Sequence, residues 1–154
     1  MRRVVVTGMG IVSSIGNDTA AVLESLREAK SGIVRADDYA ALGFRCQVHG
    51  APKVDVAALV DRRAMRFHGG GTAWNHVAMD QAIADAGLTK DDVSNERTGI
   101  VMGSGGPSTK IIVEAAGIVR DKGGPKRIGP FAVPKAMSST ASATLATWFE
   151  IKGV

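Results

Sequence analysis

The sequence is poor in cysteine, and this excludes several kinds of site. Cys46 is the only cysteine among 154 residues, so an internal disulfide and a zinc site with several cysteine ligands are both ruled out. Cys46 lies in the alternating stretch Arg45 to His49, which is typical of a short strand. Reactivity would require a lowered thiol pKa, and nothing in this stretch provides one. We expect a buried structural thiol.

Aromatic residues are also scarce, at 5% of the chain, although the net charge is +4 and the isoelectric point is near 9.5. A basic protein favours an acidic partner. Nucleic-acid binding, however, usually brings stacking aromatics or a zinc-finger or RNA-recognition pattern, and the sequence has none of these. The positive charge therefore indicates an acidic partner other than nucleic acid.

Long hydrophobic runs are absent as well. No apolar stretch approaches the length of a membrane span, and the segment after Met1 lacks the apolar region of a secretory signal. We expect a cytoplasmic protein. His49, His68 and His76 are too scattered to predict a metal site, and we expect each to be a separate surface or partly buried polar residue. No cofactor is predicted.

The opening segment is the most informative part of the sequence. Val4 to Val6 favour a buried strand that runs into Gly8 and Gly10. A dinucleotide fingerprint would place its third glycine where Ser13 stands, so a nucleotide-binding domain is only a minor alternative. The glycines allow either a ligand loop or a tight packing turn, and we favour the turn.

A second glycine segment, from Gly103 to Pro107, matches neither a phosphate-binding P-loop nor the nucleophile elbow of hydrolases. It is either a strand-to-helix turn or a turn that lines a cavity. Apolar spacing predicts α/β structure with few strands: helices near residues 18–29, 55–66, 72–86, 107–119 and 135–149, buried strands at 3–9 and 98–102, and weaker strands at 44–48 and after 150. So few strands seldom form a stable sheet. We infer a chain that is incomplete as a folding unit or is completed by another chain.

Two clusters carry the positive charge. Arg62, Arg63 and Arg66 lie within one predicted helix, and a second basic cluster spans residues 120–127. The first cluster is either an anion-binding patch or a solvated face neutralised by Asp61 and Asp55, and the spacing alone does not separate these readings.

Several blocks resemble one family over essentially the whole chain. VVVTGMGIVSSIGN, SLREAKSGI, MDQAIADAGL, GSGGPST and GPFAVPKAMSSTASATLATWFEIKGV are similar to the N-terminal part of β-ketoacyl-acyl carrier protein synthases, in particular the synthase I type of bacterial fatty-acid synthesis. The departures are His68 to Gly71, Trp74 to His76, and Trp148, which stands where we expect a proline.

The resemblance implies a fold and an activity. The family has a thiolase-like fold with αβαβα layers, built from two similar halves and working as a homodimer, and residues 1–154 would be the N-terminal portion of the first half. Family members condense an acyl thioester with malonyl-carrier protein in a decarboxylative Claisen reaction. The nucleophilic cysteine is expected beyond Val154, and neither Cys46 nor the histidines match a catalytic residue. The resemblance therefore assigns no catalytic residue to this chain, which we predict to be inactive alone.

The resemblance also implies binding residues. Carrier-protein contacts would come from Arg45, Arg62, Arg63, Arg66, Lys126 and Arg127. The acyl pocket would be lined by Gly106 and Pro107, with Met137 reaching into the pocket of a partner subunit. The alternative function is a non-catalytic partner that binds carrier protein or sets chain length.

Overall fold

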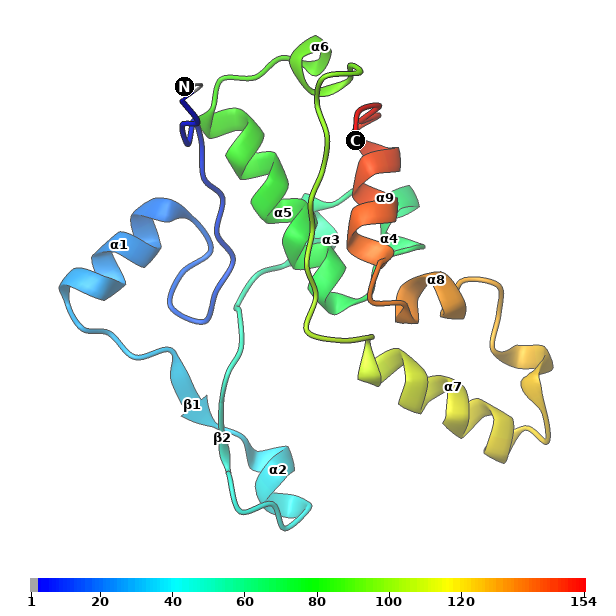
Figure 1. The fold of residues 1–154 in the computed structure, drawn as a ribbon. Coiled ribbons are helices and arrows are strands. Elements are labelled where there is room, and N and C mark those ends of the chain that lie inside the picture. Colours follow the sequence, from blue (N-terminus) through cyan, green and yellow to red (C-terminus); the bar gives the residue numbers. More distant parts are fainter. Residues whose placement is uncertain (1–2) are drawn as a thin grey trace. The chain divides into compact units, whose positions relative to one another are not determined.

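The computed structural model describes residues 3–154, which form two compact units. The first unit comprises the residues up to Asp55 together with Ala78–Ala86, and the second comprises Val56–Val77 and Gly87–Val154. Helix α5 (Gly70–Asp85) is one continuous helix that contributes a half to each unit (Figure 1).

The first unit contains one helix with a well-defined start and a small sheet. Helix α1 (Thr19–Arg27) begins where the carboxylate of Asp18 accepts a hydrogen bond from the Ala21 amide at 2.8 Å, which satisfies one of the unpaired amides of the first turn. Strand β1 (Ile33–Arg35) pairs antiparallel with β2 (Val48–Gly50), and the short helix α2 (Asp37–Ala41) lies between them.

The opening glycine segment packs tightly on the second half of α5. A Cβ added at Gly8 would lie 2.5 Å from the carbonyl oxygen of Ala82, so this position requires glycine. The Met9 amide donates to the Asp85 carboxylate at 2.9 Å, and the Ile11 amide donates to the Gln81 side chain at 2.9 Å. The glycines therefore serve close packing against a helix, as favoured from the sequence.

The second unit is helical. Its elements are α3 (Val56–Leu59), α4 (Arg62–Met65), the first half of α5, α6 (Lys90–Val93), α7 (Thr109–Asp121), the 3-10 helix η1 (Pro125–Arg127), α8 (Ala132–Ala136) and α9 (Thr140–Trp148). Its core lies where α5 meets α9: Ala73 and His76 of α5 and Leu145 of α9 are almost completely buried.

The predicted helices are present, with shifted or divided bounds. The helix expected at 55–66 is broken at Asp61 into α3 and α4, and the helix expected at 135–149 is broken between α8 and α9. The helix expected at 72–86 begins two residues earlier, because α5 starts at Gly70. Gly87, with φ +66°, ends this helix as expected.

The prediction of two buried strands was wrong for this chain. Residues 3–9 and 98–102 have no ladder partner among residues 3–154, and the only ladder in that range is β1 with β2. Val4, Val6 and Val101 are 96%, 82% and 102% exposed. The apolar pattern of these segments is typical of a buried strand. A strand is buried only between neighbouring strands, however, and the described residues do not supply them.

The last residues of the sequence contact the segment 98–102. The Gly153 amide donates to the Thr98 carbonyl at 2.9 Å, and a Cβ at Gly99 would lie 2.6 Å from the Val154 carbonyl oxygen. The turn that leads there from α9 has an unusual residue, because Glu150 has φ +55°. Within residues 3–154, no helix is long and apolar enough to span a membrane.

Candidate functional site

The arginine segment, residues 61–67, is held at its start by Asp61. The Asp61 carboxylate accepts a hydrogen bond from the Arg63 amide at 2.6 Å and so caps α4. Ala64 is buried and anchors the helix, while Arg62, Arg63 and Arg66 are all exposed. Asp61, one of the two carboxylates that the sequence offered as neutralising partners, therefore caps the backbone of the helix, and the three arginine residues are exposed.

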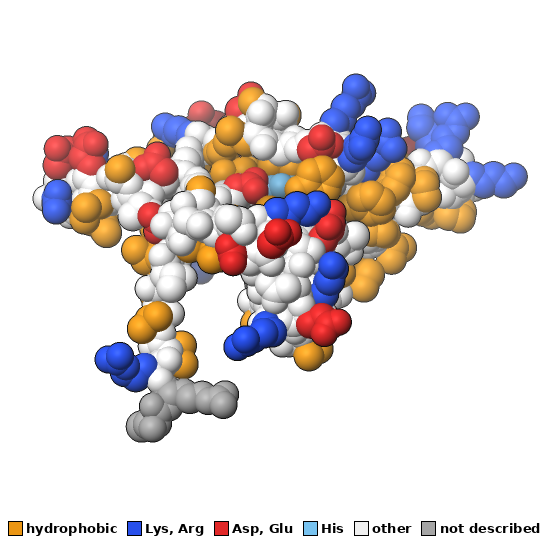
Figure 2. Space-filling view, turned by 90° about the horizontal axis from the view of Figure 1, so that it is seen from above, with side chains coloured by type: hydrophobic (Ala, Val, Ile, Leu, Met, Phe, Trp, Pro, Cys, Tyr) orange, Lys and Arg blue, Asp and Glu red, His pale blue; other side chains and the backbone are white. Residues whose placement is uncertain are grey.

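A second basic segment belongs to the same unit. Lys126 and Arg127 are both exposed on η1, which Pro125 begins after Gly124 at φ +150°. The ring of Phe67, at the end of the arginine segment, packs edge-on against Phe131, with centroids 5.1 Å apart. This contact links the end of the arginine segment to the residues that follow η1. Figure 2 shows Lys and Arg side chains projecting from the surface among hydrophobic ones.

Arg45 is the one predicted carrier-protein contact that lies in the first unit. It is exposed, but it lies just before β2 in the first unit. Its neighbour Cys46 is also exposed, and its thiol donates to the Val48 carbonyl at 3.4 Å. The expectation of a buried thiol was wrong, because Cys46 lies outside β1 and β2, in a stretch where residues 43–48 are all exposed.

The predicted acyl-pocket residues do line one cavity, of about 590 Å³, in the second unit. Gly106 and Pro107 come from the loop before α7, and Met137 follows α8. The Ser108 amide donates to the Ala136 carbonyl at 2.8 Å, which ties the loop to α8. A Cβ added at Gly106 would meet nothing within 4 Å. The cavity also includes Trp74 and charged side chains, so it is amphipathic.

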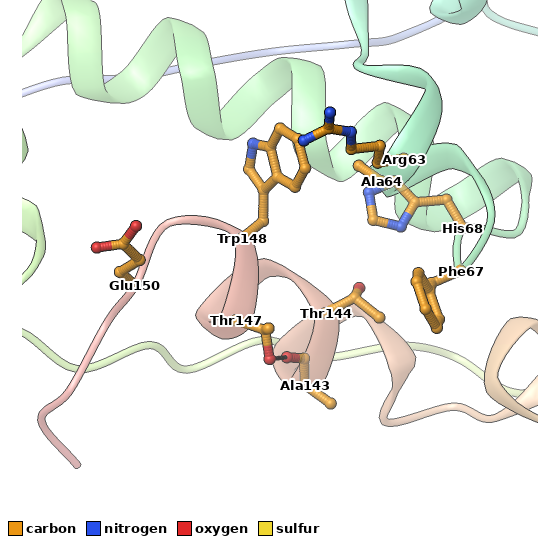
Figure 3. A pocket seen from close by; sticks show the side chains of 9 residues that line it. All are labelled: Arg63, Ala64, Phe67, His68, Ala143, Thr144, Thr147, Trp148 and Glu150. Atoms are coloured by element: carbon orange, nitrogen blue, oxygen red, sulfur yellow. Dashed lines mark hydrogen bonds between the residues drawn. The ribbon is translucent and has the colours of Figure 1, made fainter.

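A second cavity, of about 580 Å³, lies between the arginine segment and α9 (Figure 3). Its walls include the Phe67 and Trp148 rings, and the guanidinium of Arg63 lies beside the indole of Trp148 in this view. Glu150 borders the cavity, and its carboxylate accepts a hydrogen bond from the ammonium group of Lys90 at 3.0 Å.

His68 and His76 form a buried pair that sequence reasoning missed. Nε2 of His68 and Nδ1 of His76 are 2.9 Å apart, and the two side chains belong to residues that are 4% and 2% exposed. The His76 ring also contacts Trp148 and Phe149, with centroids 5.6 Å and 5.3 Å away. Nδ1 of His68 is buried without a hydrogen-bond partner.

The environment of His68 disfavours charge. Burial, followed by the neighbouring His76, lowers the pKa of His68 from 6.5 to about 4. The expectation of surface or partly buried histidines was therefore wrong for His68 and His76, whereas His49 is partly buried as expected. The available signal was that His68, His76 and Trp148 all depart from the family pattern, since these same residues meet in the fold.

Comparison with solved structures identifies the class of fold. A β-ketoacyl synthase from Burkholderia phymatum superimposes with a TM-score of 0.84 at 25% identity, over 100% of this chain and 38% of that one. The ishigamide ketosynthase/chain length factor superimposes at 0.86 with 23% identity, over 99% of this chain and 38% of that one. A ketosynthase solved with its type II polyketide acyl-carrier protein gives 0.75 at 21% identity, over 100% of this chain and 42% of that one. The fold is thus part of the thiolase-like fold of ketosynthases.

Sequence comparison gives the family. The model of the β-ketoacyl synthase N-terminal domain matches residues 1–154, and the chain belongs to this family. Curated relatives named 3-oxoacyl-[acyl-carrier-protein] synthase 1, from Haemophilus influenzae and Escherichia coli, are each 46% identical over 100% of the chain. The chain spans 38% of the length of each of these relatives.

Proposed function

We propose that this chain is the N-terminal portion of a 3-oxoacyl-[acyl-carrier-protein] synthase of fatty-acid elongation, which condenses an acyl thioester with malonyl-carrier protein and releases carbon dioxide. The observation that carries the proposal is the 46% identity to synthase 1 relatives, which extends over the whole chain. The ketosynthase fold of the two units agrees with it.

The condensation requires groups that these residues do not provide. The Cys46 thiol is exposed and donates to a backbone carbonyl, and His68 and His76 are bonded to each other in the core. No thiol among residues 3–154 is therefore placed beside a general base or an oxyanion hole. We propose that the chain alone is inactive, and that its exposed valines at 4–6 and 101 pair with further strands of a complete ketosynthase domain.

The chain's own contribution is binding. Carrier proteins of this pathway are acidic, and the exposed cations of the arginine segment and η1 form a complementary positive surface. Such a surface accelerates encounter and fixes orientation, and its effect weakens as salt screens it. Arg62, Arg63, Arg66, Lys126 and Arg127 are proposed as the docking residues of the second unit, with Arg45 as a contribution from the first.

The acyl chain is proposed to occupy the cavity that contains Gly106. The open space above Gly106 gives an apolar chain room, and Pro107 and Met137 supply part of the wall. In the homodimer that we propose, Met137 would also reach the pocket of the partner subunit. Met137 is 51% exposed in the single chain, which supports a role at an interface.

A comparison of two proteins tests the proposal. The first is the 154-residue chain, and the second is the same chain followed by the C-terminal portion of the Haemophilus influenzae synthase 1. We expect both to bind acyl carrier protein more tightly at low salt than at high salt, and only the second to release carbon dioxide from malonyl-carrier protein with an acyl acceptor. Binding without condensation by the second protein would favour a non-catalytic partner, and loss of binding by both would contradict the proposal.

A further inference from the structure

A third cavity, of about 220 Å³, lies between α7 and the chain that runs from η1 to α8. Helix α7 packs on both η1 and α8, and the Ser108 amide fixes the start of α7 to the Ala136 carbonyl at 2.8 Å. Most of the wall of this third cavity is hydrocarbon, from Ile111, Ala115, Ile118, Ile128, Phe131 and Ala132. The third cavity therefore has an apolar wall and room for several methylene groups, whose transfer from water to such a wall is favourable.

The third cavity adjoins the cavity that contains Gly106. Ile111, Glu114 and Lys135 line both cavities, so these three side chains form the boundary between them. Within residues 3–154 no ion pair joins Glu114 to Lys135, so neither side chain is fixed by the other. The stem of a lysine packs along apolar surface while its ammonium group stays in water. An alkyl chain can thus pass this boundary along the stem of Lys135 and the side chain of Ile111.

The Gly106 cavity alone is a poor place for the end of an alkyl chain to lie. Its wall carries Lys110, Glu114 and Lys135. A charged group that is covered by an alkyl chain loses its hydration, and this is costly unless the charge is paired. In the third cavity the only charged side chains are Glu114 and Lys135, at the boundary. A long alkyl chain that enters past Gly106 therefore gains most burial when its end lies in the third cavity.

We propose that the third cavity holds the distal end of a long acyl chain, which passes Gly106 and then Ile111, and that Ala115 and Ala132 provide the space for it. The identity of the occupant as an acyl chain rests on the proposed function. Ala115 and Ala132 are then specificity-determining residues for long chains. A short acyl chain ends within the Gly106 cavity and does not reach them.

The first test locates the end of the chain and needs no condensation. Octanoic and hexadecanoic acids that carry a terminal diazirine are photolysed with the complete synthase, which is the chain joined to the C-terminal portion of the Haemophilus influenzae synthase 1. The diazirine inserts into whatever lies beside it, and mass spectrometry identifies the labelled peptide. We expect the hexadecanoic probe to label the third cavity, at Ile118 or Phe131, and the octanoic probe to label only the wall of the Gly106 cavity.

The second test fills the third cavity. Each buried methylene strengthens binding roughly fourfold. We therefore expect Ala115→Phe, which excludes about two or more methylenes, to lower the specificity constant for hexadecanoyl-carrier protein at least tenfold and to leave that for octanoyl-carrier protein unchanged. Ala132→Phe fills the same cavity from α8 and replaces Ala115→Phe if that variant fails to fold. Ala116→Phe is the matched control, because Ala116 is exposed on α7 and lines neither cavity.

The two tests fail separately. A hexadecanoic probe that labels no residue of the third cavity, or an equal loss for both acyl lengths in Ala115→Phe, would overturn the assignment of this cavity to the acyl end. Labelling as expected in a complete synthase that condenses neither substrate would keep this assignment and contradict the proposed function.

Discussion

Phe67 and Phe131 are in edge-to-face contact, with ring centroids 5.1 Å apart, and this contact connects the arginine segment to the chain that follows η1. An aromatic pair in this geometry adds about 0.5–1.5 kcal/mol to the burial of the rings. Both rings remain partly exposed, at 40% and 36%. The contact therefore links the arginine segment to the residues that follow η1 with only moderate burial.

Phe131→Ala is the first predicted change. We expect it to lower the free energy of unfolding by about 1–2 kcal/mol, because the ring contact and part of the buried apolar area are lost. Binding of carrier protein should weaken as well, since the two basic segments lose their connection. Urea unfolding and a binding titration measure the two effects. Phe44→Ala removes a similar ring contact, with Tyr39 in the first unit, and should change stability alone; a loss of binding equal to that of Phe131→Ala would contradict this explanation.

Gly10→Ala is expected to destabilise the protein strongly. Its new Cβ would lie 2.7 Å from the carbonyl carbon of Ala78 and 2.9 Å from the amide nitrogen of Ala82, both in the backbone of α5. Backbone cannot move aside as a flexible side chain can, so we expect a loss of about 3 kcal/mol or more in thermal or urea unfolding. Gly103→Ala is the matched control, since its Cβ would meet nothing within 4 Å. Equal stability of the two variants would show that the glycine segment does not pack on α5.

Removal of two arginines should slow docking. For Arg62→Ala with Arg66→Ala in the complete synthase, we expect the association rate constant for carrier protein to fall about tenfold at low salt and the difference to shrink at high salt, because the exposed charges act at long range. The control removes the same charge elsewhere, with Arg27→Ala and Arg97→Ala, two other exposed arginines. Stopped-flow association measures both proteins. Identical rates would mean that net charge, and not the arginine segment, steers the encounter.

The histidine pair predicts how stability depends on pH. The pKa of His68 is lowered by folding from 6.5 to about 4, so the unfolded chain binds its proton more readily than the folded chain. The free energy of unfolding should therefore fall as the pH drops from about 6.5 towards about 4, and be insensitive to this group above that range. We expect the melting temperature to fall by roughly 5 °C across this window. His68→Gln should reduce this slope, whereas His49→Gln should retain it.

Gly106→Met tests the acyl cavity in the complete synthase. Because the space above Gly106 is open, we expect the protein to fold with nearly unchanged stability while the side chain fills part of the cavity. The preferred acyl chain should become shorter, with the specificity constant for long acyl substrates falling at least tenfold. Gly105→Met, on the same loop and equally open, is the control. An unchanged chain-length profile would place the acyl chain elsewhere.

The sequence predicted the helices well because their signals are local. The cap at Asp18, the positive-φ glycine Gly87 and the apolar periodicity of α7 each belong to a single element. The two strand predictions failed for a different reason: the valine pattern at residues 4–6 indicates what a segment prefers, whereas a strand also requires partners elsewhere in the chain. The predicted acyl-pocket residues do come together, although they belong to two separate segments.

The histidine pair could not be predicted from spacing. His68 lies before the start of α5 and His76 lies within it, so no helical period relates the two rings. Their contact depends on how the chain enters α5 at Gly69 to Gly71, and this depends on the packing of α9 against the helix. The sequence indicated only that these positions look unusual beside the blocks that resemble the family, and the fold shows that the side chains of His68, His76 and Trp148 meet.

The backbone of Glu150 has a practical implication for protein engineering. At φ +55° a residue with a side chain is in a conformation that costs free energy, so the surrounding structure must hold it there, and the Glu150 carboxylate is hydrogen-bonded to Lys90. The backbone conformation of Glu150 thus sets the direction in which the chain leaves α9. Chimeras that replace the residues after Glu150 should keep the direction in which the chain leaves α9. Glu150→Gly, by contrast, would allow the following residues to take several directions.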